Sequence, residues 1–277
     1  MAIKSVLVHI DGAERCRFRL ATAMRIAQDF DAQLVGIYLV PDTELSPSVA
    51  ALLPNDIVDA RVRAIGEEQH HAEAAFRKAV AAEGLARVEW RAPAGNPLEA
   101  AVAHGRCADL FVLGQREGPG AAFDEELVSE VMLASGRPLL VVPYIGARPS
   151  YCDNVLIAWD GGREAARAVA DALPLLKRAQ QIHVIAVKGN GHEHAGEHPG
   201  GDRLAAWLLQ HGITAEIGTY DVPGISIGEW MLSRAADLGS DLIVMGGYGH
   251  TRMRELILGG VTRTILRAMT VPVLFSH

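Results

Sequence analysis

Aromatic side chains, cysteines and long apolar runs are all scarce in this sequence of 277 residues. Phe, Trp and Tyr make up 5% of the chain although 49% of its residues are hydrophobic, so its cores must be built mainly from Val, Leu, Ile and Ala. The three cysteines, Cys16, Cys107 and Cys152, are odd in number and lack metal-ligand spacing, so we expect reduced thiols. No apolar run approaches the ~20 residues that cross a bilayer.

Basic residues are also in deficit. The chain has 26 Lys and Arg against 33 Asp and Glu, a net charge of −7, which argues against a general nucleic-acid or anionic-membrane binder. The first residues, "MAIKSVLVHIDG", start directly with a strand pattern and lack the apolar segment of a secretory signal. We therefore expect a cytoplasmic protein without nucleic-acid or membrane partners, and an unknown protein partner stays open.

The sequence contains an internal repeat of domain length. Three segments of the first half resemble three of the second half, in the same order. The pairs are "VLVHIDGAERC" (6–16) with "VLIAWDGGREA" (155–165), "ADLFVLG" (108–114) with "SDLIVMG" (240–246), and "RPLLVVP" (137–143) with "VPVLFSH" (271–277). This pattern predicts two domains, residues 1–147 and 151–277.

In each half, short apolar runs alternate with segments of helical periodicity. The pattern predicts strands at 5–10, 33–40, 87–92, 108–113, 138–143, 154–159, 181–187, 213–221, 241–245 and 271–275. Helical patterns lie between them, the longest at 56–84. Buried strands alternating with helices predict an α/β fold with two doubly wound domains, each with a five-stranded parallel sheet. Ligands bind such sheets at the carboxyl ends of the strands.

The stretch "MGGYGHTRMRELILGG" (245–260) is the strongest candidate site. Gly246 and Gly249 permit close approach of the backbone, and Gly259 and Gly260 precede a predicted helix whose free N–H groups attract anions. The spacing is neither that of a P-loop nor that of a Rossmann fingerprint. The pattern favours a phosphate site, although glycines that only form turns remain the alternative.

The order of a strand ending in Asp, a helix, Gly-x2-Gly-x9-Gly and a last strand led by Pro resembles the universal stress protein family. The second half matches at Gly246, Gly249 and Gly259, and the repeat resembles a tandem member of that family. The resemblance implies an adenine nucleotide alpha-hydrolase-like fold. It also implies two pseudo-twofold related domains that pair through their last strands as an intramolecular pseudo-dimer, with a further homodimer as an option.

In one branch of the family the resemblance implies a site for ATP or ADP, with Mg as a candidate companion. The adenosine contacts would map to Asp160, Val187 and Met245. The phosphates would lie against Gly246, Gly249, Gly259, Gly260, Val261 and Thr262, with His250 as a further candidate. Gly260 departs from the Ser or Thr of the family motif and loses a hydrogen bond worth about 1.5–3 kcal/mol. Thr262 either compensates for it or only begins the helix.

The first half lacks most of this glycine motif. Gly114 is kept, but Glu117 takes the place of the second glycine, and Glu125 and Glu126 take the places of Gly259 and Gly260. Carboxylates there repel a triphosphate, so we expect no ATP binding in the first domain.

Other residue clusters support weaker hypotheses. His192, His194 and His198 could bind a metal, but a polar loop is favoured. Asp160 has no nucleophile or base at a fixed spacing, so we identify no catalytic residues and expect slow ATP hydrolysis at most. The expected role is that of a stress-response regulatory or protective protein. The alternatives are a small-molecule hydrolase or nucleotidyl transferase of the wider adenine-binding α/β group, and an interaction module without nucleotide.

Overall fold

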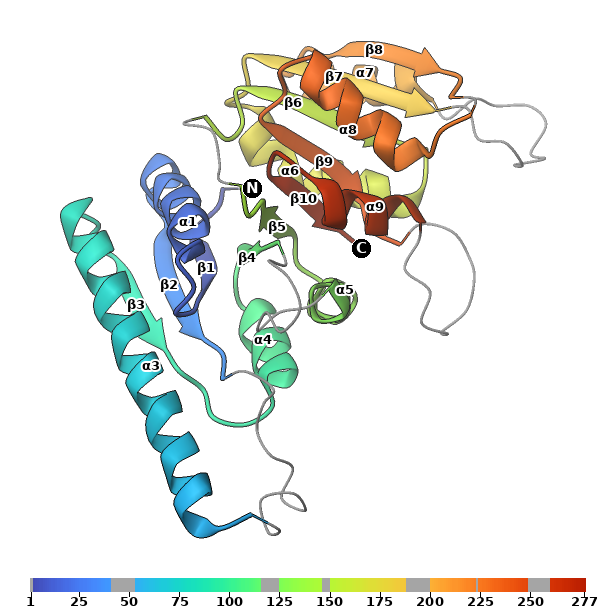
Figure 1. Ribbon diagram of the computed structural model, residues 1–277. Helices are drawn as coiled ribbons and strands as arrows, with labels where there is room; N and C mark the ends of the chain where they lie inside the picture. Colours follow the sequence, from blue (N-terminus) through green and yellow to red (C-terminus); the bar gives the residue numbers. More distant parts are fainter. Residues whose placement is uncertain are drawn as a thin grey trace. The chain divides into compact units, whose positions relative to one another are not determined.

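The computed structural model describes residues 2–40, 53–115, 125–145, 150–187, 200–222, 224–248 and 260–277 (Figure 1). The chain divides into two compact units. The first unit is Ile3–Ser135, and the second is Gly136–His277 together with the first two residues.

The first unit is a parallel sheet with helices on its faces. Its strands have the order β3-β2-β1-β4, and all their pairings are parallel. Its elements are β1 (Ser5–Ile10), α1 (Cys16–Phe30), β2 (Gln33–Tyr38), α3 (Asn55–Ala82), β3 (Val88–Arg91), α4 (Pro97–Gly105), β4 (Leu110–Gly114) and α5 (Glu125–Ser135). The strands β1 and β2 are buried over nearly their whole length, as expected for a sheet covered on both faces.

Local sequence signals set the ends of these elements. The Asn96 side chain caps α4 by accepting hydrogen bonds from the N–H groups of Leu98 and Glu99, and Pro97 occupies the first turn. Asp31 ends α1 in the left-handed conformation, at φ 48°.

The second unit has a six-stranded sheet of order β5-β10-β9-β6-β7-β8. Helices α8 and α9 pack together on one face of this sheet, and α6 lies against the other face (Figure 1). Its elements are β5 (Leu139–Val142), β6 (Asn154–Trp159), α6 (Arg163–Leu176), β7 (Gln181–Val187), α7 (Gly201–Gln210), β8 (Glu216–Tyr220), α8 (Ile227–Asp237), β9 (Leu242–Gly246), α9 (Gly260–Ala268) and β10 (Val273–Ser276).

The predicted α/β fold is confirmed, and the predicted strands and helices correspond to observed ones. The strand β5 differs in its grouping, because it pairs antiparallel with β10, with Val141 opposite Val273, and so belongs to the second unit. The sequence pattern had placed it as the last strand of the first domain. The boundaries 1–147 and 151–277 thus remain a prediction about the repeats, while the contacts divide the chain at Ser135.

A repeated polar contact supports the internal duplication. The Asp109 carboxylate accepts hydrogen bonds from the N–H groups of Lys4 and Ser5, at 2.8 and 3.0 Å. In the second unit the Asp241 carboxylate accepts from Asp153 and Asn154, at 3.0 and 2.9 Å. In both halves an Asp just before the fourth strand of the repeat therefore fixes the start of the first strand.

Candidate functional site

The second unit brings several predicted site residues to one edge of its sheet. β6 is paired with β7 as far as Trp159 opposite Ala186, and with β9 as far as Ile157 opposite Val244. Asp160, Val187 and Gly246 therefore lie together at the carboxyl ends of three neighbouring strands. The strands are parallel, and the strand order reverses between β6 and β9, which is the position where doubly wound sheets bind ligands.

Asp160 presents its carboxylate at this edge. One oxygen accepts a hydrogen bond from the N–H of Gly162 at 2.8 Å, which closes a turn over Gly161. Gly161 has φ 77°, a value that favours glycine. Asp160 itself is exposed, so its carboxylate is accessible to a ligand.

Gly246 is required by the packing of α6. A Cβ atom at this position would lie 2.6 Å from the Ala165 nitrogen and 2.7 Å from the Glu164 carbonyl carbon. The sequence pattern favours a glycine here for close approach of a phosphate. The structure adds a different reason, because the first turn of α6 already occupies the space beside it.

An acidic residue that the sequence pattern does not single out lies beside this glycine. Glu164, in the first turn of α6, is 8% exposed and forms an ion pair with Arg163. Burial raises the pKa of Glu164, but hydrogen bonds from Arg163 and from its own backbone N–H outweigh burial and lower it overall. The feature of the sequence that points to Glu164 is its position in the first turn of a predicted helix, where carboxylates are favoured.

Hydrogen bonds hold Gly247, the first residue after β9, to the end of β10. The N–H of Gly247 donates to the Ser276 carbonyl at 2.9 Å, and the Gly247 carbonyl lies 3.0 Å from Nδ1 of His277. Because a carbonyl only accepts, Nδ1 of His277 carries the proton. Tyr248 follows with φ 61°, and its ring lies edge-on to His277 at 6.5 Å.

The first residues of α9 differ in exposure. Gly260 is exposed, and a Cβ atom placed on it would meet no atom within 4 Å. Val261 is half-buried, whereas Thr262 is 3% exposed, a burial that favours packing over phosphate contact. Met245, one of the residues implied for adenosine contact, is likewise buried, at 5% exposure.

The remaining residues of the prediction lie outside the part of the chain that the structure describes. These are Gly249, His250 and Gly259 of the glycine motif, Glu117 of the first half, and His192, His194 and His198. Of Glu125 and Glu126 the structure gives the helical backbone only.

The corresponding edge of the first unit is filled by a buried ion pair. Asp11 follows β1 and accepts from the N–H of Ala13 at 3.1 Å, as Asp160 does from Gly162. Its other oxygen lies 2.6 Å from a guanidinium nitrogen of Arg19, whose Nε donates to the His9 carbonyl at 2.6 Å. The side chain of Arg19 is 8% exposed.

The Arg19 guanidinium also lies against the end of β4. A Cβ atom on Gly114 would be 2.8 Å from this guanidinium. The Arg19 side chain thus covers the ends of both β1 and β4 in the first unit. Its signal in the sequence was its position on the buried stripe of α1, one turn before Ala23.

Burial and charge shift several titrating groups at this edge. Burial, helped by the charge of Arg19, lowers the pKa of His9 to about 3. Burial raises the pKa of Asp11, but the charge of Arg19 together with the hydrogen bonds from Arg19 and from the Ala13 N–H outweighs burial and lowers the pKa overall. Burial and the negative charges of Glu68 and Asp11 raise the pKa of Tyr38 to about 12. His9 and Tyr38 are therefore neutral and Asp11 is charged at pH 7.

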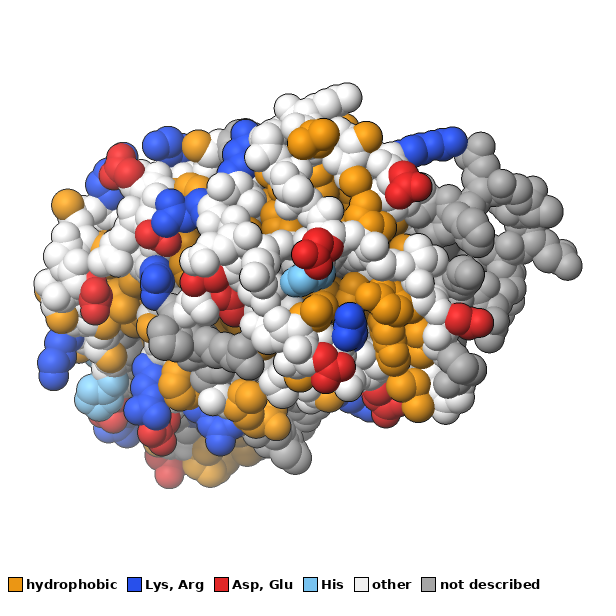
Figure 2. Space-filling model, turned by 90° about the horizontal axis from the view of Figure 1, so that it is seen from above, with side chains coloured by type: hydrophobic (Ala, Val, Ile, Leu, Met, Phe, Trp, Pro, Cys, Tyr) orange, Lys and Arg blue, Asp and Glu red, His pale blue; other side chains and the backbone are white. Residues whose placement is uncertain are grey.

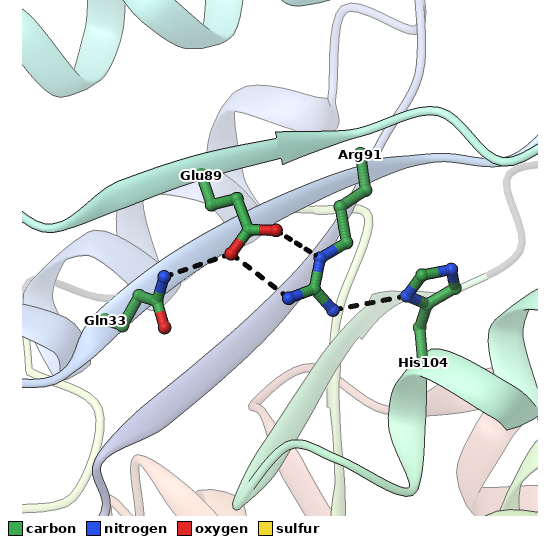
Figure 3. A network of polar contacts seen from close by, with 4 residues as sticks. All are labelled: Gln33, Glu89, Arg91 and His104. Carbon is green, nitrogen blue, oxygen red and sulfur yellow. Dashed lines mark hydrogen bonds and ion pairs between the residues drawn. The ribbon is translucent and has the colours of Figure 1, made fainter.

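A second polar network of the first unit joins β2, β3 and α4 (Figure 3). Arg91 donates from Nε and a terminal nitrogen to Glu89, at 2.7 and 3.1 Å, and Gln33 donates to the same carboxylate at 3.1 Å. Another Arg91 nitrogen lies 3.2 Å from Nδ1 of His104. Since arginine only donates, this histidine is neutral with its proton on Nε2. The network ties the edge strand to α4.

The surface carries charges of both signs. On the face shown in Figure 2, described Lys and Arg side chains are interspersed with Asp and Glu, and the described side chains there form no large basic patch. None of the helices in the described ranges is both long and apolar enough to traverse a bilayer.

Comparison with known proteins agrees with this architecture. Residues 152–277 match the sequence model of the universal stress protein family. A universal stress protein of Methanocaldococcus jannaschii is 39% identical over 46 residues, which cover 17% of this chain and only 28% of that protein. Residues 152–277 are thus similar to the universal stress protein family.

Solved structures extend the likeness to the fold of the whole chain. A universal stress protein from Archaeoglobus fulgidus has a TM-score of 0.75 at 18% identity, covering 98% of this chain and 97% of the other. A structure from Pseudomonas aeruginosa has a TM-score of 0.61 at 18% identity, with coverage of 99% and 93%. At this identity the likeness concerns the fold.

Proposed function

We propose that the second unit binds an adenine nucleotide, ATP or ADP, at the carboxyl edge of β6 and β9. The protein then acts as a stress-response regulatory or protective protein whose state depends on that nucleotide. The observation that carries this proposal is the accessible Asp160 carboxylate at the point where the strand order reverses. Val187 adjoins it at the end of β7, in a position suited to the nucleoside.

The phosphates are assigned to the start of α9. Gly260 leaves open space beside the first turn of this helix, whose N–H groups and dipole favour an anion. The backbone and Cβ of Glu164 lie against Gly246, and its carboxylate is paired with Arg163. That pairing reduces its repulsion of a phosphate, and a Mg ion bound with the nucleotide would reduce it further.

Mass spectrometry of the ligand released by heating the full chain, with calorimetric titration by ATP and ADP, tests the proposal. Released nucleotide and saturable binding support it. A different metabolite, turned over slowly, would indicate an enzyme of the wider adenine-binding group. A protein that releases no ligand and binds neither nucleotide would indicate an interaction module.

A matched pair of variants locates the site. Asp160→Asn keeps the oxygen that accepts from Gly162 and removes the charge, and we expect affinity to fall about tenfold. Asp221→Asn makes the same change on an exposed residue after β8, two strands away, and should leave affinity unchanged. Equal affinities of the two variants would contradict the proposed location.

A further inference from the structure

Both polar groups of the Gly247 backbone are bonded to the end of β10. Its N–H donates to the Ser276 carbonyl at 2.9 Å, and its carbonyl accepts from Nδ1 of His277, 3.0 Å away. β9 and β10 lie side by side as parallel neighbours, with Gly246 opposite Ser276 (Figure 1). The two contacts of Gly247 therefore continue the pairing of these strands by one residue. Because Gly247 is buried, a carbonyl without this donor would be costly.

The contact with His277 fixes the orientation of the peptide that joins Gly247 to Tyr248. In a planar trans peptide the carbonyl and the N–H point in opposite directions. Since the Gly247 carbonyl points toward His277 at the end of β10, the N–H side of this peptide points away from β10. β9 lies between β10 and β6, so the carbonyl is turned away from the side on which Asp160 is exposed.

This orientation suits an anion at the carboxyl edge of β6 and β9. A carbonyl oxygen carries partial negative charge and repels a phosphate, whereas backbone N–H groups attract one. Tyr248 has φ 61°, the left-handed conformation that occurs in anion-binding turns of the backbone. Gly247 alone would not hold the peptide in this orientation, because a glycine backbone adopts many conformations.

We propose that His277 is a positioning residue for the phosphates in the second unit. By donating to the Gly247 carbonyl, it holds the peptide after Gly247 in the orientation that admits an anion. The His277 ring also lies edge-on to Tyr248, with centroids 6.5 Å apart. This role rests on the nucleotide site proposed above, and His277 acts on that site through the backbone of Gly247.

The first repeat lacks this donor. In the paired segments "RPLLVVP" (137–143) and "VPVLFSH" (271–277), Pro143 takes the place of His277. The side chain of proline has no hydrogen-bond donor. In the paired segments that end at Gly114 and Gly246, the next residue is Gln115 in the first repeat and Gly247 in the second. Both members of the contact thus differ in the half for which we expect no ATP binding.

Calorimetric titration of the full chain and its variants with ATP tests the proposal. His277→Phe keeps a ring beside Tyr248 and removes the donor, so we expect the affinity to fall about fivefold. His277→Asn places an N–H where Nδ1 was and should bind ATP within about twofold of the unchanged chain. The control His183→Phe makes the first change near the start of β7, at the opposite edge of the sheet, and should leave the affinity unchanged.

Restored affinity in His277→Asn separates the donated hydrogen bond from packing of the ring. Equal affinities of His277→Phe and the unchanged chain would overturn the role of His277 and leave the nucleotide site in place. Equal losses in His277→Phe and His277→Asn would also overturn it, because the ring and not the donor would then matter. If the unchanged chain binds no ATP, the nucleotide site itself is contradicted and the role of His277 with it.

Discussion

At the carboxyl end of its first strand, each repeat forms the same turn, but the two repeats differ in what covers that turn. Asp11 and Asp160 each follow the first strand of a repeat and accept a hydrogen bond from the N–H two residues later. Arg19 then pairs with Asp11 and covers Gly114, whereas Asp160 remains exposed. Among the described residues, a side chain of the protein itself fills the first edge, whereas the second edge presents the exposed Asp160.

A single helix position accounts for much of this difference. Arg19 comes eight residues after Asp11, and the residue eight after Asp160 is Ala168, which is fully buried. The methyl group of Ala168 cannot reach the ends of the strands. The guanidinium of Arg19 reaches the Asp11 carboxylate and the backbones of His9 and Gly114. The duplicated fold therefore keeps its turn, while a side chain on the following helix decides whether the edge is accessible.

Removing the guanidinium should have the largest effect. In Arg19→Met the mostly buried Asp11 loses its ion pair, and breaking a buried pair costs about 3–5 kcal/mol. We expect this loss in the free energy of unfolding of the first unit, measured by hydrogen exchange of β1 peptides in urea. Arg163→Met is the counterpart in the second unit, where the side chain is 83% exposed, and should change stability by less than about 0.5 kcal/mol. Similar values for both variants would contradict the difference between the edges.

Acid should destabilise the first unit before the second. Because the pKa of His9 is about 3 when folded and 6.5 when unfolded, the unfolded state binds the proton first as the pH falls. Stability is thus complete above pH 6.5 and falls by roughly 3 kcal/mol by pH 4.5. The corresponding residue of the second unit is Ala158, which does not titrate.

The same measurement in His9→Leu isolates this contribution. The slope between pH 6.5 and 4.5 should disappear from the exchange of β1 peptides and stay unchanged in β6 peptides. Asp11 and Glu164 have lowered pKa values, so their stabilisation is lost only below their ordinary range and does not obscure the window. A slope that persists in the variant would assign the acid sensitivity to another group.

A methyl group on Gly246 should be more harmful than one on Gly260. In Gly246→Ala the new atom meets the backbone of α6 at 2.6 Å, and overpacking of this kind costs about 1–3 kcal/mol. Gly260→Ala meets no atom within 4 Å and should be neutral or slightly stabilising. Thermal unfolding of the two variants measures the difference. Equal melting temperatures would mean that α6 shifts without strain to admit the methyl group.

Most of the fold could be predicted from periodicity, because buried parallel strands read as continuous apolar runs and the helices between them keep an apolar stripe. The grouping of β5 could not, since it depends on pairing with β10 far along the chain. The edge at Asp160 was predicted because strand ends and glycines are local signals. Arg19 was missed because its contact with Asp11 spans eight residues and depends on the direction in which a long side chain leaves a buried helix face.

Gly260 allows a test of whether the missing hydroxyl group limits the affinity of the second unit for ATP. Gly260→Ser adds a hydroxyl at the start of α9 in open space, so the fold should be unaffected. If a phosphate lies there, the added hydrogen bond of about 1.5 kcal/mol should tighten ATP binding about tenfold. Gly260→Ala provides the same Cβ without the hydroxyl and should bind ATP like the unchanged chain. Calorimetric titration of both variants measures the effect, and equal affinities would mean that the phosphates lie away from the start of α9.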